Sequence, residues 1–159
     1  MKKRLKFYVI FNANASGGRK LRLVNKVIYL LKIDHDVELF KTRSEEDAKE
    51  IFKNLSIKNF DRLVLAGGDG SVCFGVNQIL KYPSLADKKI GYIPTGTANI
   101  LQIETKIPKN AEFISKVLIA GDTKKISLSK VNDQFFFLMT GIGFDGKIVA
   151  SIDTRIKKY

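Results

Sequence analysis

The chain alternates short apolar runs with helical stripes of apolar residues, and glycine-rich loops join several of these segments. Buried β-strands are predicted at 7–11, 62–66 and 90–93, because β-branched and aromatic residues cluster there and turn-forming residues follow. Alternating strands and helices are typical of an α/β fold with a mostly parallel sheet. We therefore predict a Rossmann-like layered sheet with helices on both faces.

Three helical stripes and a further strand complete this pattern. The stripes consist of Leu21, Val24, Ile28 and Leu31; Ala48, Ile51, Phe52 and Leu55; and Val72, Val76, Ile79 and Leu80. Ser44 precedes the second stripe and acidic residues follow it, which predicts Ser44 as a helix N-cap. A strand is predicted at 37–40, a helix at 111–120 that ends at Gly121, and a β-hairpin formed by 126–129 and 135–139.

Length and cysteine content limit the class of protein. The 159 residues fit one domain, which we predict over 1–159. A single cysteine, Cys73, cannot form an internal disulfide, as expected in a reducing compartment, and Cys73 is predicted to be a buried structural thiol. The apolar run at 7–11 is shorter than the about 7 to 15 residues of a secretory signal core. We expect a cytoplasmic protein, with peripheral contact at the inner membrane face.

The net charge of the chain limits the kinds of partner that it is expected to bind. The sequence has 28 Lys and Arg against 16 Asp and Glu, a net charge of +12. Such a charge suits nucleic acid, an anionic membrane surface or a phosphate-rich ligand. The basic residues are spread along the chain without an RNA- or DNA-binding motif, so no nucleic-acid partner is expected.

Glycine clusters follow three of the predicted strands. They comprise Gly17 and Gly18; Gly67, Gly68 and Gly70; and Gly96. In an open α/β sheet the loops after the strands line the edge where ligands bind. Glycine there allows an anion to approach the backbone amides, and a helix N-terminus behind the loop adds positive partial charge. These loops predict a phosphate-rich ligand.

The strongest single motif is Gly-Gly-Asp-Gly-Ser at 67–71. Asp69 is a carboxylate at the predicted phosphate edge, where it could hold a divalent cation or accept a hydroxyl proton. Ser71 could cap the following helix or bind a phosphate oxygen. The alternative is that both residues only form a turn and a helix cap. The related loop at 94–99, one βα unit later, favours ligand binding.

Other kinds of site lack the residues they need. The segment 141–146 matches a dinucleotide-binding glycine pattern, but too few residues follow it to supply the acid expected about 20 residues later. The sequence has no P-loop motif. His35 is the only histidine, which excludes a cluster of histidine ligands, and it is predicted to be a solvated loop residue.

Together, these motifs resemble the catalytic domain of the diacylglycerol kinase, sphingosine kinase and related bacterial lipid kinase family. The resemblance covers about 9–149. The family's Asn-Pro-x-Ser-Gly, Gly-Gly-Asp-Gly-Thr, Pro-x-Gly-Thr-x-Asn and Gly-Phe-Asp-Ala motifs are similar to 12–18, 67–71, 94–99 and 143–146. Its threonine before an Asp-Ala pair resembles Thr42. The chain departs from the family in lacking the proline after Asn12 and in having Ile100 in place of an aspartate.

The resemblance implies the nucleotide-binding lobe of a lipid kinase, with the fold shared by the N-terminal domains of phosphofructokinase and NAD kinase. ATP and Mg²⁺ would be its cofactors, and a diacylglycerol-like lipid at an anionic membrane surface its acceptor, with the basic run at 2–6 holding the chain against the lipid. The implied nucleotide-binding residues are Asn12, Ser16, Gly17, Gly18, Thr42, Gly67, Gly68, Asp69, Gly70, Ser71, Thr97 and Asn99. Asp69 is the implied catalytic residue, and the metal ligands stay unassigned.

Family members also carry a second, β-sandwich lobe that forms the lipid pocket, and we expect this lobe to be absent from the chain. Two alternative functions stay open. One is a small-molecule kinase of the NAD-kinase type, which shares the glycine-rich turn at 67–71 but is expected to have an Asn-Glu pair that this sequence lacks. The other is a truncated chain that binds nucleotide without turnover.

Overall fold

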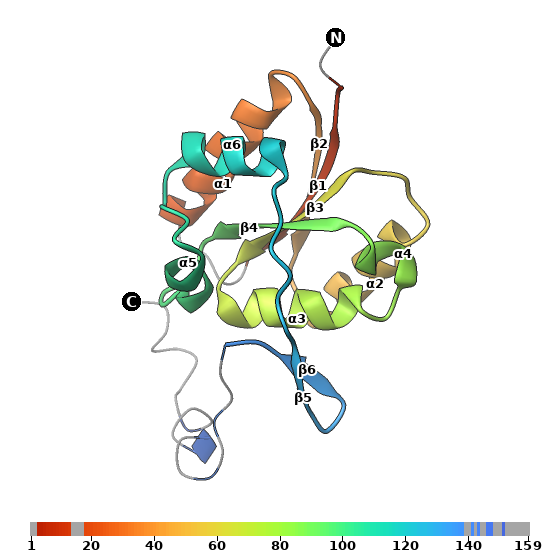
Figure 1. Cartoon of the computed structure of the whole chain (residues 1–159), viewed down its shortest axis with the longest axis vertical. Coiled ribbons are helices and arrows are strands. Elements are labelled where there is room, and N and C mark those ends of the chain that lie inside the picture. The colour runs from red at the N-terminus through yellow and green to blue at the C-terminus, as the bar shows by residue number, and fades with distance from the viewer. Residues whose placement is uncertain are drawn as a thin grey trace. The chain divides into compact units, whose positions relative to one another are not determined.

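The computed structural model describes residues 3–13 and 18–138, together with 141, 143, 146, 147 and 151. The chain divides into two compact units, Met1–Lys125 and Ile126–Tyr159, and each is described by itself. Figure 1 shows the elements of both units. Among the residues described, no helix is long and apolar enough to cross a membrane.

A four-stranded sheet in the order β2-β1-β3-β4 forms the centre of the first unit. Its strands are β1 (Lys6–Asn12), β2 (Asp36–Thr42), β3 (Arg62–Gly67) and β4 (Lys89–Pro94). All neighbouring strands are parallel, and the register pairs Asn12 with Thr42 and Gly67 with Pro94. The four carboxyl ends therefore meet at one edge of the sheet.

Helices cover both faces of this sheet, as predicted. Helices α1 (Gly18–Lys32) and α6 (Ala111–Ala120) lie on one face, and α2 (Glu45–Leu55) and α3 (Asp69–Ile79) lie on the other (Figure 1). Alternate residues of β1 point to the two faces of the sheet and pack against the helices or side chains on each face. Phe7, Val9 and Phe11 pack into the cluster formed with α1 and α6. Tyr8 points to the opposite face, where its ring lies 5.3 Å from that of Phe40 and 4.7 Å from that of Phe60.

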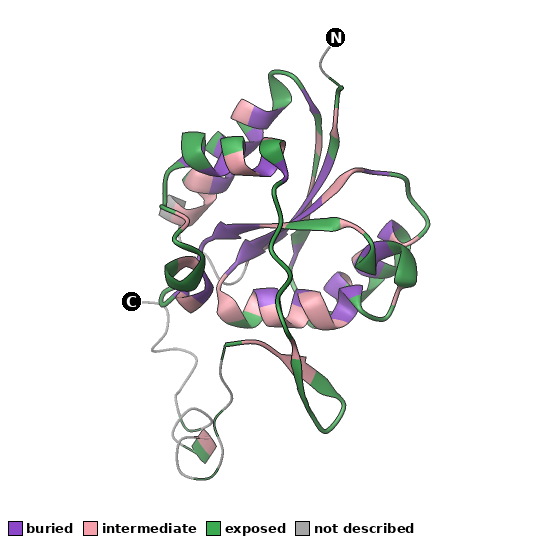
Figure 2. Ribbon diagram, in the orientation of Figure 1, coloured by how far each residue is buried: buried purple, intermediate pink, exposed green. Residues whose placement is uncertain are grey.

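Two local sequence signals form as predicted. The Ser44 side chain accepts a hydrogen bond from the Asp47 backbone N–H at 3.1 Å and caps α2. Gly121 ends α6 in the left-handed conformation, with φ of 67°. Figure 2 shows that the two central strands, β1 and β3, are buried, whereas the edge strand β2, the start of β4 and the outward faces of the helices are partly or fully exposed.

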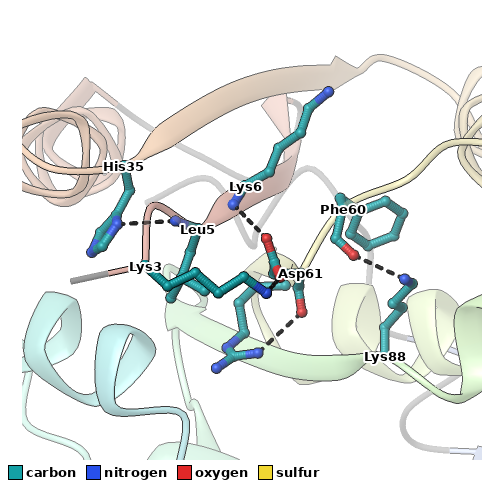
Figure 3. A network of polar contacts seen from close by, with 8 residues as sticks. Lys3, Leu5, Lys6, His35, Phe60, Asp61 and Lys88 are labelled. Carbon is teal, nitrogen blue, oxygen red and sulfur yellow. Dashed lines mark hydrogen bonds and ion pairs between the residues drawn. The ribbon is translucent and has the colours of Figure 1, made fainter. Parts of the chain in front are cut away.

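Polar contacts fix the amino edge of the sheet (Figure 3). The Asp61 carboxylate accepts hydrogen bonds from the Lys3 ammonium and from the Lys6 backbone N–H, both at 2.9 Å. The prediction that His35 is solvated is wrong. His35 is 2% exposed, because its ring packs against Phe7 and its Nδ1 accepts the Leu5 backbone N–H at 3.3 Å.

Two short helices, α4 (Pro83–Ala86) and α5 (Ile100–Thr105), were not predicted. In the second unit, β5 (Ser129–Val131) and β6 (Gln134–Phe136) form the predicted antiparallel hairpin. Its strands are shorter than predicted, because pairing begins only at Ser129 and ends at Phe136. Of the predicted second strand, Met139 lies outside the described residues.

Candidate functional site

A cavity of about 340 Å³ opens at the carboxyl edge of the sheet, between α2 and α3. Its lining includes five of the residues predicted to bind nucleotide, namely Asn12, Thr42, Gly67, Gly70 and Ser71. Parallel strands bring these residues together from β1, β2 and the β3–α3 turn. Ser16 and Gly17 lie outside the described residues, and Gly18 begins α1.

The remaining walls of the cavity combine apolar and polar side chains. Ile10, Phe52 and Leu65 belong to the apolar wall, and Arg43 and Glu45 lie at its polar part. These residues were not assigned to the site from the sequence, although Arg43 directly follows Thr42 and Glu45 stands two residues further on. The cavity lining thus offers both apolar contacts and charged or polar groups to a ligand.

The N-terminus of α3 faces this cavity without a side-chain cap. Gly68 is the N-cap residue, and Gly70 and Ser71 of the first turn line the cavity. First-turn amides have no acceptor within their own helix, and the helix dipole makes this end positive. Such an end suits an anion, phosphate in particular. Gly70 is open to solvent, with nothing within 4 Å of the place a Cβ would occupy.

Ser71 does not cap α3, so this part of the prediction is wrong. The helix begins at Asp69, which places Ser71 within the first turn. Its hydroxyl instead accepts a hydrogen bond from Asn12 Nδ2 at 3.1 Å. This contact ties the end of β1 to the start of α3 on the cavity wall.

Asp69 connects two neighbouring loops. Its carboxylate oxygens accept the backbone N–H groups of Ile100 at 3.0 Å and Leu101 at 3.1 Å. Asp69 therefore caps α5, the helix that follows the 94–99 loop. It does not line the cavity that Gly70 and Ser71 line.

Asn99 shapes the 94–99 loop from inside. It is fully buried, with φ of 52°. Its Oδ1 accepts hydrogen bonds from the Gly96 N–H at 2.8 Å and the Tyr92 hydroxyl at 3.0 Å, and its Nδ2 donates to the Gly96 carbonyl at 2.7 Å. Burial, together with the charge of Asp69, raises the pKa of the Tyr92 hydroxyl, which keeps this donor protonated. Thr97 is exposed on the same loop.

The two glycine loops touch through their backbones. A Cβ on Gly68 would lie 2.9 Å from the Gly96 Cα, closer than a side chain tolerates. The Thr95 N–H also donates to the Gly67 carbonyl at 2.9 Å. Glycine is therefore required where the loops meet. The predicted site residues form two adjoining groups. The cavity group consists of Asn12, Thr42, Gly67, Gly70 and Ser71, and the loop-bracing group consists of Gly68, Asp69 and Asn99.

The acidic side chains at this edge come from Asp69 and from the first turn of α2, where Glu45 lines the cavity. Within the described part of the chain, no group of three or more His, Cys, Asp or Glu side chains could hold a metal ion. Asp69 is the acid within the first turn of α3, and its oxygens already accept two backbone amides. This donor set fits a Mg²⁺ ion that is bound mainly through ligand phosphates, as Mg²⁺ commonly is in kinases.

Comparison with known proteins agrees with the sequence resemblance. The family model described as "Diacylglycerol kinase catalytic domain" matches residues 6–131. A diacylglycerol kinase from Staphylococcus aureus strain JH9 is 30% identical over 133 residues, which cover 82% of this chain and 42% of that protein. Its counterpart in the bovine strain RF122 is 29% identical over 144 residues, covering 90% and 44%.

The fold is likewise similar to solved structures. A crystal structure of a diacylglycerol kinase from Bacillus anthracis matches with a TM-score of 0.71 and 24% identity. The match covers 86% of this chain and 47% of that one. The chain thus spans less than half the length of the relatives that it matches.

Proposed function

The chain belongs to the diacylglycerol kinase catalytic-domain family, and we propose that it forms the nucleotide-binding lobe of an ATP-dependent lipid kinase. In this proposal the γ-phosphoryl group of ATP is transferred to the hydroxyl of a diacylglycerol-like lipid. The observation that carries the proposal is the cavity at the carboxyl edge, beside the uncapped N-terminus of α3. Phosphoryl transfer depends mainly on positioning and charge stabilisation, which such a site can supply.

The cavity lining suggests how a nucleotide is held. The apolar wall that includes Phe52 and Leu65 suits the base, and the first-turn amides of α3 suit the phosphates. The Thr42 and Ser71 hydroxyls and the Asn12 amide are the polar groups that would fix its orientation. Ser16, Gly17, Gly18 and Thr97 are proposed to complete the phosphate contacts.

Asp69 and Asn99 are proposed to act on the other side of the glycine turn. Asp69 holds α5 through two amides and offers its remaining lone pairs to Mg²⁺ or to the acceptor hydroxyl. When bound, Mg²⁺ would neutralise charge on the phosphates. Asn99 is buried and its amide is hydrogen-bonded within the loop and to Tyr92, so we propose that it positions the loop that carries Thr97.

The Asp69→Asn variant tests the role of Asp69. Because the amide still accepts one hydrogen bond, we expect the variant to fold, to bind ATP with weakened dependence on Mg²⁺, and to lose at least about a hundredfold in phosphoryl transfer. Exposed Asp87→Asn is the matched control. Radiolabelled ATP with diacylglycerol in mixed micelles measures transfer, and isothermal titration measures ATP binding. Unchanged turnover and unchanged Mg²⁺ dependence of ATP binding in Asp69→Asn would contradict the proposed role of Asp69 in phosphoryl transfer.

The same assay separates the alternative functions when it is run with a panel of acceptors. Phosphorylation of diacylglycerol, but not of NAD, is the result that the proposal expects. Phosphorylation of NAD alone would make the chain a small-molecule kinase. ATP binding without transfer to any acceptor would indicate a nucleotide-binding chain without turnover.

A further inference from the structure

The two helical layers of the first unit differ in charge, and we infer that the layer formed by α1 and α6 docks on an anionic lipid bilayer. We call its outward surface the basic face. Its defining residues are Arg22, Lys26, Tyr29 and Lys32 of α1 with Phe113 and Lys116 of α6, all of them exposed. The docking surface rests on the proposed function only in the choice of a lipid partner.

The two helices of the basic face form one layer. Both pack on the same side of the sheet, into the cluster that contains Val27 and Ile114 (Figure 1). The Lys26 ammonium and the Glu112 carboxylate form an ion pair at 2.6 Å across the two helices. Figure 2 shows the outward side of this layer as exposed.

Charge distinguishes this layer from the opposite one. Helix α1 contains no acidic residue, and the single acid of α6, Glu112, is paired with Lys26. Helix α2 on the other side begins with three acids, Glu45, Glu46 and Asp47. An anionic surface is therefore attracted to the basic face and repelled by the α2 side.

Large apolar side chains are exposed among these basic residues. Tyr29 is 70% exposed and Phe113 is 46% exposed, and Ile33, directly after α1, is 64% exposed. Tyr29 and Ile33 are four residues apart at the end of α1, where the His35 N–H still donates to the Leu31 carbonyl, so they lie on one side of this last turn. Basic residues around exposed aromatic and aliphatic side chains are typical of helices that lie in the membrane interface.

Docking by this face leaves the nucleotide cavity free. Its described lining comes from β1, β2, β3, α2 and α3 and the loops between them, and includes none of the described side chains of α1 or α6. ATP could then enter from the aqueous side while the basic face contacts lipid. The acidic N-terminus of α2 would point away from the bilayer.

Vesicle cosedimentation without nucleotide or diacylglycerol tests the docking surface directly. We expect binding to phosphatidylglycerol vesicles, none to phosphatidylcholine vesicles, and a decline as salt shortens the screening length. Arg22→Glu with Lys32→Glu is expected to weaken binding at least about tenfold. Lys49→Glu with Lys53→Glu on α2 changes the net charge equally and is expected to leave binding unchanged. Circular dichroism checks that each variant folds. If the Arg22→Glu, Lys32→Glu variant unfolds, the neutral variant with Arg22→Gln and Lys32→Gln is used in its place.

The contribution of the exposed apolar side chains of the basic face is tested separately. Tyr29→Ser with Phe113→Ser is expected to reduce vesicle binding several-fold, whereas Ile57→Ser, at a position 88% exposed outside this layer, is not. Equal losses in the α1 and α2 charge pairs, or no binding to anionic vesicles, would overturn the inference. Self-association that requires Tyr29 and Phe113, without vesicle binding, would assign the face to a second copy of the chain. Vesicle binding without ATP binding would keep the docking surface and contradict the nucleotide site.

Discussion

Asn99 combines a left-handed backbone with a buried amide that makes three hydrogen bonds. Asparagine tolerates this conformation better than most residues, and its side chain replaces the backbone partners that the tight turn leaves open. The Tyr92 hydroxyl holds the same amide from β4. One residue thereby fixes the loop that faces the Gly-Gly-Asp-Gly-Ser turn.

Asn99→Ala is therefore expected to lower the free energy of unfolding by about 3 kcal/mol, because it removes these hydrogen bonds and leaves buried polar groups unpaired. Urea unfolding followed by circular dichroism measures the change. Asn132→Ala is the control, since Asn132 has the same φ of 52° but is exposed in the hairpin turn. Equal losses in the two variants would attribute the effect to the backbone conformation alone.

At the scale of elements, Asp61 ties the start of β3 to the start of β1. The hydrogen bond from the Lys6 backbone N–H, followed by the Lys3 ammonium, lowers the pKa of the Asp61 carboxyl below its usual value. A carboxyl with a lowered pKa in the folded state stabilises the fold above its unfolded pKa. That contribution is lost as the pH falls through the folded pKa.

We expect Asp61→Asn to be less stable than the native chain at pH 7, by about 1 to 2 kcal/mol. The difference should shrink as the pH falls below about 4, where the native carboxyl also becomes protonated. Urea unfolding at a series of pH values measures it, with the exposed Asp87→Asn as control. A difference that does not change with pH would contradict the role of the Asp61 charge.

Sequence patterns predicted the elements whose signals are local. The strands of the sheet, the Ser44 cap and the Gly121 helix end all depend on neighbouring residues. Contacts between distant segments were not predictable from such signals. His35 is buried by Leu5 and Phe7 despite its two acidic neighbours, and α5 is capped by the Asp69 carboxylate at the start of α3.

The candidate site shows the same division. Its residues were predicted because they lie in the loops that follow the strands, and parallel pairing does bring Asn12, Thr42 and Gly67 to one edge of the sheet. The division into a cavity group and a loop-bracing group depends on side-chain directions, which motif spacing does not contain. For that reason Arg43 and Glu45 were missed.

At the scale of the first unit, one sheet separates two chemically different layers. The side with α2 and α3 contains the cavity, and the side with α1 and α6 carries the basic face. The two proposals therefore predict that nucleotide binding and membrane docking are altered by different substitutions. The net charge of +12, at first compatible with several anionic partners, is thereby assigned to a nucleotide and a lipid surface in the two proposals.

The central claim, that nucleotide phosphates bind at the N-terminus of α3, is tested most directly by isothermal titration of Mg·ATP into Gly70→Glu and Gly70→Gln. The space at Gly70 is open, so both variants are expected to fold, and an acid in the first helical turn favours the helix. We predict that Gly70→Glu weakens ATP binding at least about tenfold through charge repulsion, whereas Gly70→Gln retains most of the native affinity. Native ATP affinity in folded Gly70→Glu would contradict the claim.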